Sequence, residues 1–247
     1  MPEYSMRRIA VLLLVLVAPV VRAQSNDAIA RAVLQLTPVG ALPPLVTSTI
    51  QAEVQREAAL ALRYGYISQS DGGADANNGG VTAIFPVGLV GTISVTAGVF
   101  KYTCEECKAG LMLALGGDRR IGDMVLGSGS DGSRIQVALN GELGFGHPQG
   151  SNISDGSVLT GAVGLPISFI SGSRTRDAMR IVPFVTPGFG FGQFTGEGSP
   201  SGSALMLGGG LGIYNRSSSI ALSFGFQYLG VRDASTQIGL NLVLGGR

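Results

Sequence analysis

The strongest constraint on the fold is a strict two-residue alternation near the end of the chain. Large apolar residues alternate with small or polar ones over residues 219–228 and again over 237–244. The large residues are Ile220, Leu222, Phe224, Phe226 and Tyr228, then Ile238, Leu240, Leu242 and Leu244. A period of two predicts β-strands, because successive side chains point to opposite faces of a sheet.

The composition indicates which face of these strands points outward. A soluble sheet covers its outer face with charges, but only 13% of this chain is charged and 39 residues are glycine. Large apolar residues outside and small polar ones inside are the pattern of a transmembrane β-barrel. The alternative is a soluble, exported, lipocalin-like barrel that binds an apolar ligand and turns its large residues inward.

The first 23 residues have the pattern of a cleavable secretory signal. Arg7 and Arg8 precede an apolar run over residues 9–17, and Val21 and Ala23 provide small residues before a cleavage point after Ala23. The apolar run is about half of the roughly 20 residues that a spanning helix needs. The whole chain has 17 basic and 16 acidic residues. Cleavage of the signal would remove three arginines and one glutamate, which leaves 14 basic and 15 acidic residues in the mature chain. The mature chain is nearly neutral and its sequence has no basic stripe, so no nucleic-acid partner is expected.

We expect three regions: the signal peptide over 1–23, a periplasmic lead-in over 24–55 with a short helix through Leu36, and a barrel over 56–247. The fold class is all-β, a closed antiparallel up-and-down barrel with ten strands favoured over eight. The expected strands are 57–67, 81–88, 91–102, 109–117, 133–146, 157–169, 179–194, 203–214, 219–230 and 236–245. An even count puts both termini in the periplasm.

Two features fit this barrel poorly. The connection 118–132 is long for the periplasmic side, so either the fourth strand runs further or the count is eight. Four prolines also fall inside expected strands: Pro86, Pro166, Pro183 and Pro187. Because proline cannot donate to a β-ladder, each must sit at a bulge, a strand end or an unpaired position.

Three segments carry a family resemblance: residues 164–168 (GLPIS), 182–192 (VPFVTPGFGFG) and 207–212 (LGGGLG). With the strand pattern over 56–247, they resemble small bacterial outer-membrane β-barrel proteins of eight to ten strands. The resemblance implies outer-membrane localisation, contact with outer-membrane lipid and insertion by the barrel-assembly machinery. The family usually ends on an aromatic residue, whereas this chain ends on Arg247. Its members range from structural barrels to pores, adhesins and enzymes, so the fold implies no activity.

Cys104 and Cys107 flank two glutamates, and we expect a disulfide at a hairpin tip because an exported pair oxidises. A redox motif or half of a zinc site are the alternatives, but a βα context and two further ligands are missing. No cofactor is expected.

Other candidates for chemistry are weaker. His147 could form a catalytic trio with Ser151, Ser154 and Asp155, although a loop rich in Gly and Ser holds such a geometry poorly. The glycine-rich stretch 127–132 is interpreted as a turn, because no helix follows it. Calcium could bind the oxygens of the first loop: Asp71, Asp75 and Asn77. We therefore expect no enzyme.

Strand parity directs a set of polar side chains into the barrel. They are Arg63, Gln136, Asn140, Glu142, Gln227, Gln237 and Asn241. Such groups form either a hydrogen-bonded plug or the lining of a narrow pore. We expect six aromatic residues to form an interfacial girdle: Tyr64, Tyr66, Phe100, Tyr102, Tyr214 and Tyr228. The sequence thus predicts an outer-membrane barrel with a structural or surface-interaction role and an unknown extracellular ligand, or else a narrow pore for small solutes.

Overall fold

The fold is described from a computed structural model. It covers residues 58–69, 75–88, 90–103, 107–126, 132–150, 156–171, 179–195, 201–215, 220–229 and 235–245. The expected signal peptide and lead-in lie outside these residues. No helix in the described ranges is long and apolar enough to cross a membrane.

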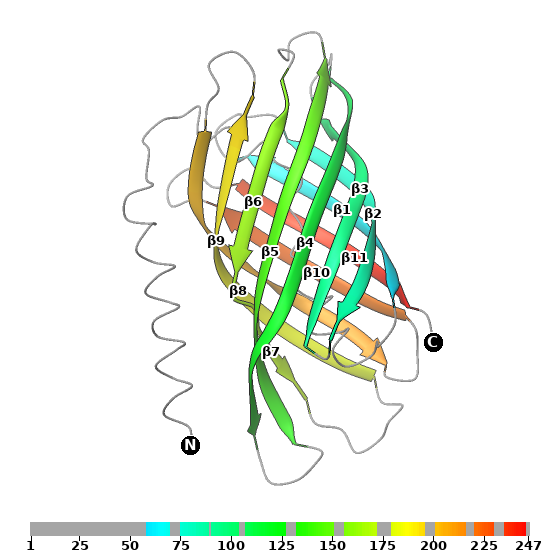
Figure 1. Ribbon diagram of the computed structural model, residues 1–247, viewed down its shortest axis with the longest axis vertical. Coiled ribbons are helices and arrows are strands. Elements are labelled where there is room, and N and C mark those ends of the chain that lie inside the picture. The colour runs from blue at the N-terminus through cyan, green and yellow to red at the C-terminus, as the bar shows by residue number, and fades with distance from the viewer. Residues whose placement is uncertain are drawn as a thin grey trace.

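Antiparallel strands form a closed ring (Figure 1). Their bounds are β1 (Ala59–Gln69), β2 (Ala76–Val87), β3 (Gly91–Tyr102), β4 (Cys107–Leu126), β5 (Ser133–Gly150), β6 (Val158–Gly164), β7 (Ile167–Ile170), β8 (Met179–Phe194), β9 (Ser201–Asn215), β10 (Ile220–Leu229) and β11 (Ser235–Gly245). Each strand pairs with its neighbours in sequence, and β1 pairs with β11 to close the ring.

The labels β6 and β7 denote two halves of one strand. Both pair with β5 on one side and with β8 on the other, in an unchanged register. Their pairing is interrupted only at Leu165 and Pro166. The barrel therefore has ten strands, which confirms the predicted fold class and the preference for ten over eight.

We name the two ends of the barrel by what connects the strands there. At the turn end β1 begins and β11 ends, and β2–β3, β4–β5, β7–β8 and β9–β10 are joined. The remaining connections lie at the opposite loop end. The β2–β3 connection passes through Gly88 at φ 65°, a left-handed conformation that favours glycine.

The long connection has a simple explanation. β4 runs to Leu126 and pairs with β5 down to Ser133, so the fourth strand does run further than expected. β3 pairs with β4 only as far as Arg119. The last residues of β4 and the first of β5 therefore extend beyond the β2–β3 connection, as the green hairpin at the lower end of Figure 1 shows. β2 also begins earlier than predicted, at Ala76 rather than residue 81.

The two faces of each strand separate as the alternation predicted. In β3, Thr92, Ser94 and Thr96 are buried inside, whereas Ile93 and Val95 are exposed outside. The outward face carries large apolar side chains around the described wall. Examples from eight strands are Leu60, Val81, Val99, Leu113, Leu143, Ile181, Leu207 and Phe224. A lipocalin-like barrel requires the reverse arrangement, so this alternative was wrong.

Close strand approach depends on glycine at the inward position Gly98. A Cβ there would lie 2.6 Å from Met112 Cε and 2.8 Å from Gly80 Cα, and it would also strike the Gly79 carbonyl oxygen. At the neighbouring Gly79, the nearest atom to an added Cβ is the Arg63 carbonyl oxygen at 3.7 Å, an ordinary contact.

We predict that Gly98→Val destabilises the barrel by about 1–3 kcal/mol, because overpacking displaces the backbone of β2. Urea unfolding of the refolded protein, followed as the heat-modifiable band on a gel, measures the change. Gly79→Val is the matched control and should stay near wild type. Equal loss of stability in both variants would contradict the prediction.

Candidate functional site: the barrel interior

The centre of the barrel holds an ion pair that crosses the interior. Arg63 on β1 reaches Glu142 on β5, with Nη1 3.4 Å from Oε2, although β2, β3 and β4 separate the two strands along the wall. The two side chains are only 7% and 2% exposed. Removing two charges from water is costly, so such a pair persists only when further hydrogen bonds support it.

Threonines supply part of that support. Arg63 Nη1 donates to Thr96 Oγ1 at 2.9 Å, and Thr96 Oγ1 lies 2.8 Å from Thr82 Oγ1. Gly116 of β4 leaves space for the Glu142 carboxylate. A Cβ at this position would lie only 3.3 Å from Glu142 Oε2 and 2.8 Å from Ser94 Oγ, which is too close for ordinary packing. We call Arg63, Thr82, Thr96 and Glu142 the central polar layer.

Three of the other predicted interior residues are also buried, two of them nearer the ends of the barrel. Gln136 and Asn140 lie on the same face of β5 as Glu142, and Gln227 lies on β10; all three are buried. Asn241 of β11 pairs in register with Arg63, but its side chain lies outside the described residues, as does that of Gln237. Parity alone had placed Arg63 and Glu142 inside; it had not paired them with each other.

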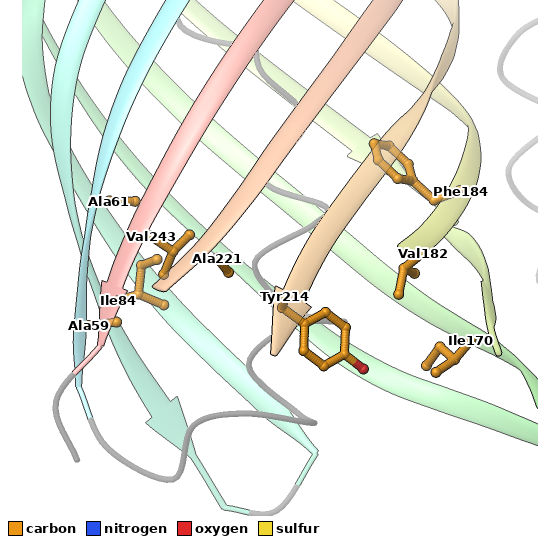
Figure 2. Close-up of a cluster of buried hydrophobic side chains, with 9 residues drawn as sticks. All are labelled: Ala59, Ala61, Ile84, Ile170, Val182, Phe184, Tyr214, Ala221 and Val243. Carbon is orange, nitrogen blue, oxygen red and sulfur yellow. The ribbon is translucent and has the colours of Figure 1, made fainter. Parts of the chain in front are cut away.

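Apolar side chains pack on both sides of the central polar layer. The turn-end cluster, drawn in Figure 2, consists of Ala59, Ala61, Ile84, Ile170, Val182, Phe184, Tyr214, Ala221 and Val243. The loop-end cluster consists of Ile67, Ala76, Phe100, Tyr102, Cys107, Met112 and Ala114. The rings of Phe100 and Tyr102 meet edge to face at 5.5 Å, a favourable aromatic geometry. The interior thus contains one apolar cluster toward each end, and buried polar residues accompany both: Gln136, Ser168 and Arg180 near the turn end, and Asn78 and Gln227 near the loop end.

The prediction of an aromatic girdle was partly wrong, because three of its six residues lie inside the barrel. Phe100, Tyr102 and Tyr214 are buried in the interior clusters, while Tyr64 and Tyr228 are exposed on the outer face. Parity contained the signal: Phe100 and Tyr102 follow Thr96 and other small inward residues at even spacing. Strand position therefore decides the side of the wall on which these rings lie, whatever their aromatic character.

The remaining candidates are only partly covered by the structure. Cys107 is buried at the start of β4, but Cys104 lies outside the described residues, so the disulfide stays a prediction. His147 is exposed, and its Nδ1 lies 3.2 Å from Ser157 Oγ. Ser151, Ser154 and Asp155 lie outside the described residues, and the catalytic trio is untested.

The calcium hypothesis receives no support from the residues at the edge of the first loop. Asp75 accepts a short hydrogen bond from the Tyr66 hydroxyl, and Asn77 Oδ1 accepts from the Tyr64 hydroxyl at 2.8 Å. The Asp75 carbonyl also accepts from the Thr103 backbone amide at 2.8 Å. These oxygens hold the loop end together, while Asp71 lies outside the described residues. Within the described ranges, no group of three or more His, Cys, Asp or Glu could hold a metal.

Removing one partner of the central ion pair should be far more damaging than removing both. We predict that Glu142→Leu destabilises the barrel by about 3–5 kcal/mol, because it leaves Arg63 charged and buried. Arg63→Met combined with Glu142→Leu should return close to wild type. A double-mutant cycle by urea unfolding in lipid vesicles measures both.

The exposed pair of Arg120 and Asp123, 3.6 Å apart, is the matched control for this cycle. Asp123→Ala should cost no more than about 1 kcal/mol, as is usual for exposed pairs. Additive effects of the Arg63 and Glu142 substitutions would show that the pair does not act as a unit.

No protein-family model matches the chain, and no curated protein matches it significantly. Among solved structures, it is similar to the translocator domain of the autotransporter NalP from Neisseria meningitidis. The identity is 10% and the TM-score 0.36, over 82% of this chain and 93% of that chain. It is also similar to Ail, the attachment invasion locus protein of Yersinia pestis, with 12% identity and a TM-score of 0.32, over 76% of this chain and 95% of that one. Ail in complex with the heparin analogue sucrose octasulfate has 11% identity and a TM-score of 0.30, over 76% and 96% of the two chains.

Proposed function

We propose that the chain is an integral outer-membrane barrel with a packed interior, and that its role is structural or surface-interacting rather than catalytic. The observation that carries the membrane assignment is the outer face. Its large apolar side chains are exposed on strand after strand, which in water would be an aggregation liability. A bilayer removes that liability, and because β1 pairs with β11 no strand of the ring has an unpaired edge facing lipid.

The filled interior favours a packed barrel over the pore alternative. A water-filled channel needs a continuous polar lining, as in porins. Here apolar clusters interrupt the polar lining toward both ends, and the ion pair of Arg63 and Glu142 spans the interior between β1 and β5. Planar-bilayer recordings decide between the two: a packed barrel gives no steady conductance, whereas stepwise single-channel currents support the narrow pore.

Binding at the surface would then fall to the loop end. The resemblance of fold to Ail, whose structure in complex with a heparin analogue is known, makes a polyanionic glycan a reasonable first ligand to screen. The test is binding of heparin fragments to the barrel in nanodiscs. Binding that survives shaving of the loop-end connections by protease would place the ligand elsewhere.

The membrane assignment predicts a depth-dependent cost of charge on the outer face of β4. Leu113 is exposed on that face near the middle of the barrel wall, and Leu113→Arg should cost about 2–4 kcal/mol in lipid vesicles. Met124 is equally exposed but lies at the turn end, past the point where β3 begins to pair with β4. We expect this position to lie near the edge of the bilayer, so Met124→Arg should cost about 0–1 kcal/mol. Unfolding by urea in vesicles measures both. Equal costs at the two positions would contradict a bilayer around the barrel.

A further inference from the structure

The far end of the β4–β5 hairpin leaves one strand edge without a neighbour. Along the wall β4 lies between β3 and β5, but its contact with β3 ends where the Arg120 amide donates to the Val90 carbonyl at 2.7 Å. On the other side, β5 continues to pair with β4 as far as Leu126. Among the described residues, no strand pairs with the other edge of residues 121–126, which we call the free edge.

The side chains of this stretch show that it has left the barrel wall. Buried and exposed residues alternate strictly in β4 over residues 110–115. A bulge at Ile121 then shifts the register against β5, and beyond it residues 123–126 are all exposed. Three of these four are large and apolar, so the free edge belongs to a strand with apolar side chains exposed on both faces: Met124, Val125 and Leu126.

The proposed function places this stretch in water. The β4–β5 hairpin projects beyond the rest of the turn end, as the green strands at the lower end of Figure 1 show. A bilayer that surrounds the wall therefore leaves the end of the hairpin outside the hydrocarbon. An apolar strand with unpaired amides and carbonyls is a template for strand addition, and natural proteins pair or cover such edges.

A second copy of the chain fits the free edge poorly. Two barrels in one bilayer point the same way along the membrane normal. A two-fold axis along that normal preserves the direction of each strand along it, so two free edges would meet in parallel. Parallel pairs are slightly less stable per residue than antiparallel ones, and every recorded ladder of this barrel is antiparallel.

The chain itself has a segment suited to the free edge. β1 begins at Ala59 at the turn end, so the preceding residues join the barrel at the same end as the hairpin tip. Residues 45–50 (LVTSTI) lie outside the described ranges and follow Pro43 and Pro44. Four of these six residues are β-branched, a composition that favours a strand. The expected signal cleavage leaves them in the mature chain.

Chain direction and length both fit this segment. An antiparallel partner on the free edge runs from the hairpin tip toward the wall and ends beside Val90. The ladders put Ala59 two strands away and level with Ser94. That separation is about 10 Å across the strands and about 13 Å along them. The nine residues from Ile50 to Ala59 span up to about 30 Å when extended, so they bridge it with slack.

We propose that residues 45–50 add a strand to the free edge, antiparallel to β4. The register that uses the whole edge makes three aliphatic cross-strand pairs: Leu45 with Leu126, Val46 with Val125, and Ile50 with Ile121. Ser48 then faces Asp123, so its hydroxyl can donate to the carboxylate. Aliphatic pairs and hydrogen-bonded pairs both stabilise neighbouring strands. The lead-in thereby caps the protruding hairpin and ties the N-terminal side of β1 to β4.

The first test is hydrogen exchange of the mature chain in nanodiscs. Successive amides of a strand point to opposite edges, so two adjacent prolines remove at least one bonded donor. Replacing Thr47 and Ser48 by proline should therefore speed exchange of the amides on the free edge at least tenfold. Proline at Gly40 and Ala41, in the same lead-in, is the matched control and should leave that exchange unchanged. Amides of residues 111–115 should stay protected in both variants.

The second test fixes the neighbour by a disulfide, in a background with serine at Cys104 and Cys107. The proposed register puts Thr47 opposite Met124, within the distance that a disulfide requires. Thr47→Cys with Met124→Cys should give at least fivefold more intramolecular disulfide than Gly40→Cys with Met124→Cys. Nanodiscs that hold a single barrel keep a second copy away from the edge.

The outcomes identify what covers the edge. Fast exchange on the free edge of the unmodified chain, beside slow exchange over 111–115, would overturn the pairing and leave the barrel intact. Slow exchange that survives the Thr47 and Ser48 prolines would assign the edge to another occupant. Disulfide-linked dimers in vesicles, without the intramolecular disulfide in single-barrel nanodiscs, would identify that occupant as a second copy and overturn the proposal equally.

A separate measurement reports on the membrane assignment on which the proposal rests. The chain has no Trp, and Phe224 is exposed on the outer face, so Phe224→Trp is a single probe of that face. Lipid brominated along the acyl chain should quench its fluorescence strongly. Weak quenching would overturn the membrane assignment, whereas the exchange and disulfide results would still decide the pairing.

Discussion

The rest of the structure depends on the hydrogen-bond ladder between β1 and β11. It runs without a break from the pair of Ala59 and Gly245 to that of Gln69 and Ser235 and turns an eleven-element sheet into a ring. Without it, two long apolar edges would be left with unpaired amides and carbonyls. Once the ring is closed, every residue of a strand points either inward or outward. The two-residue alternation then separates side chains that pack in the interior from side chains that are exposed on the outer face.

The interior then has to be filled by short side chains and a few long ones. Arg63 and Glu142 occupy the centre, and the apolar clusters occupy the ends. A buried ion pair adds little net stability relative to apolar residues of the same size, because desolvation offsets the attraction. Its contribution here is specificity. A register slip of one residue in β1 or β5 would turn one charge to the outer face and leave the other buried alone.

Much of this was predictable from parity, and the failures have a common cause. The faces of the strands and the inward position of Gln136 and Glu142 followed from the period of two alone. Local turn chemistry misled at both ends of the barrel: residues 77–80 (NNGG) and the charged stretch 118–123 suggested loops, yet they pair within β2 and β4. Pairing partners supplied by neighbouring strands outweigh local preference. The contact of Arg63 with Glu142 was not predictable, since it needs ring closure to bring β1 and β5 face to face.

The prolines show how a closed ring accommodates residues that oppose it. A ring has no edge strand on which a missing donor faces water, so every proline within the ladder leaves a carbonyl without its partner. Spread over several strands, such losses would weaken the whole wall, including the closure between β1 and β11. Pro166, Pro183 and Pro187 remove donors on the strand of β6 and β7 and its two neighbours, Pro86 and Pro148 lie near the ends of β2 and β5, and the closure ladder contains no proline. The described wall is therefore bonded less completely between β5, the strand of β6 and β7, and β8 than it is at the closure between β1 and β11.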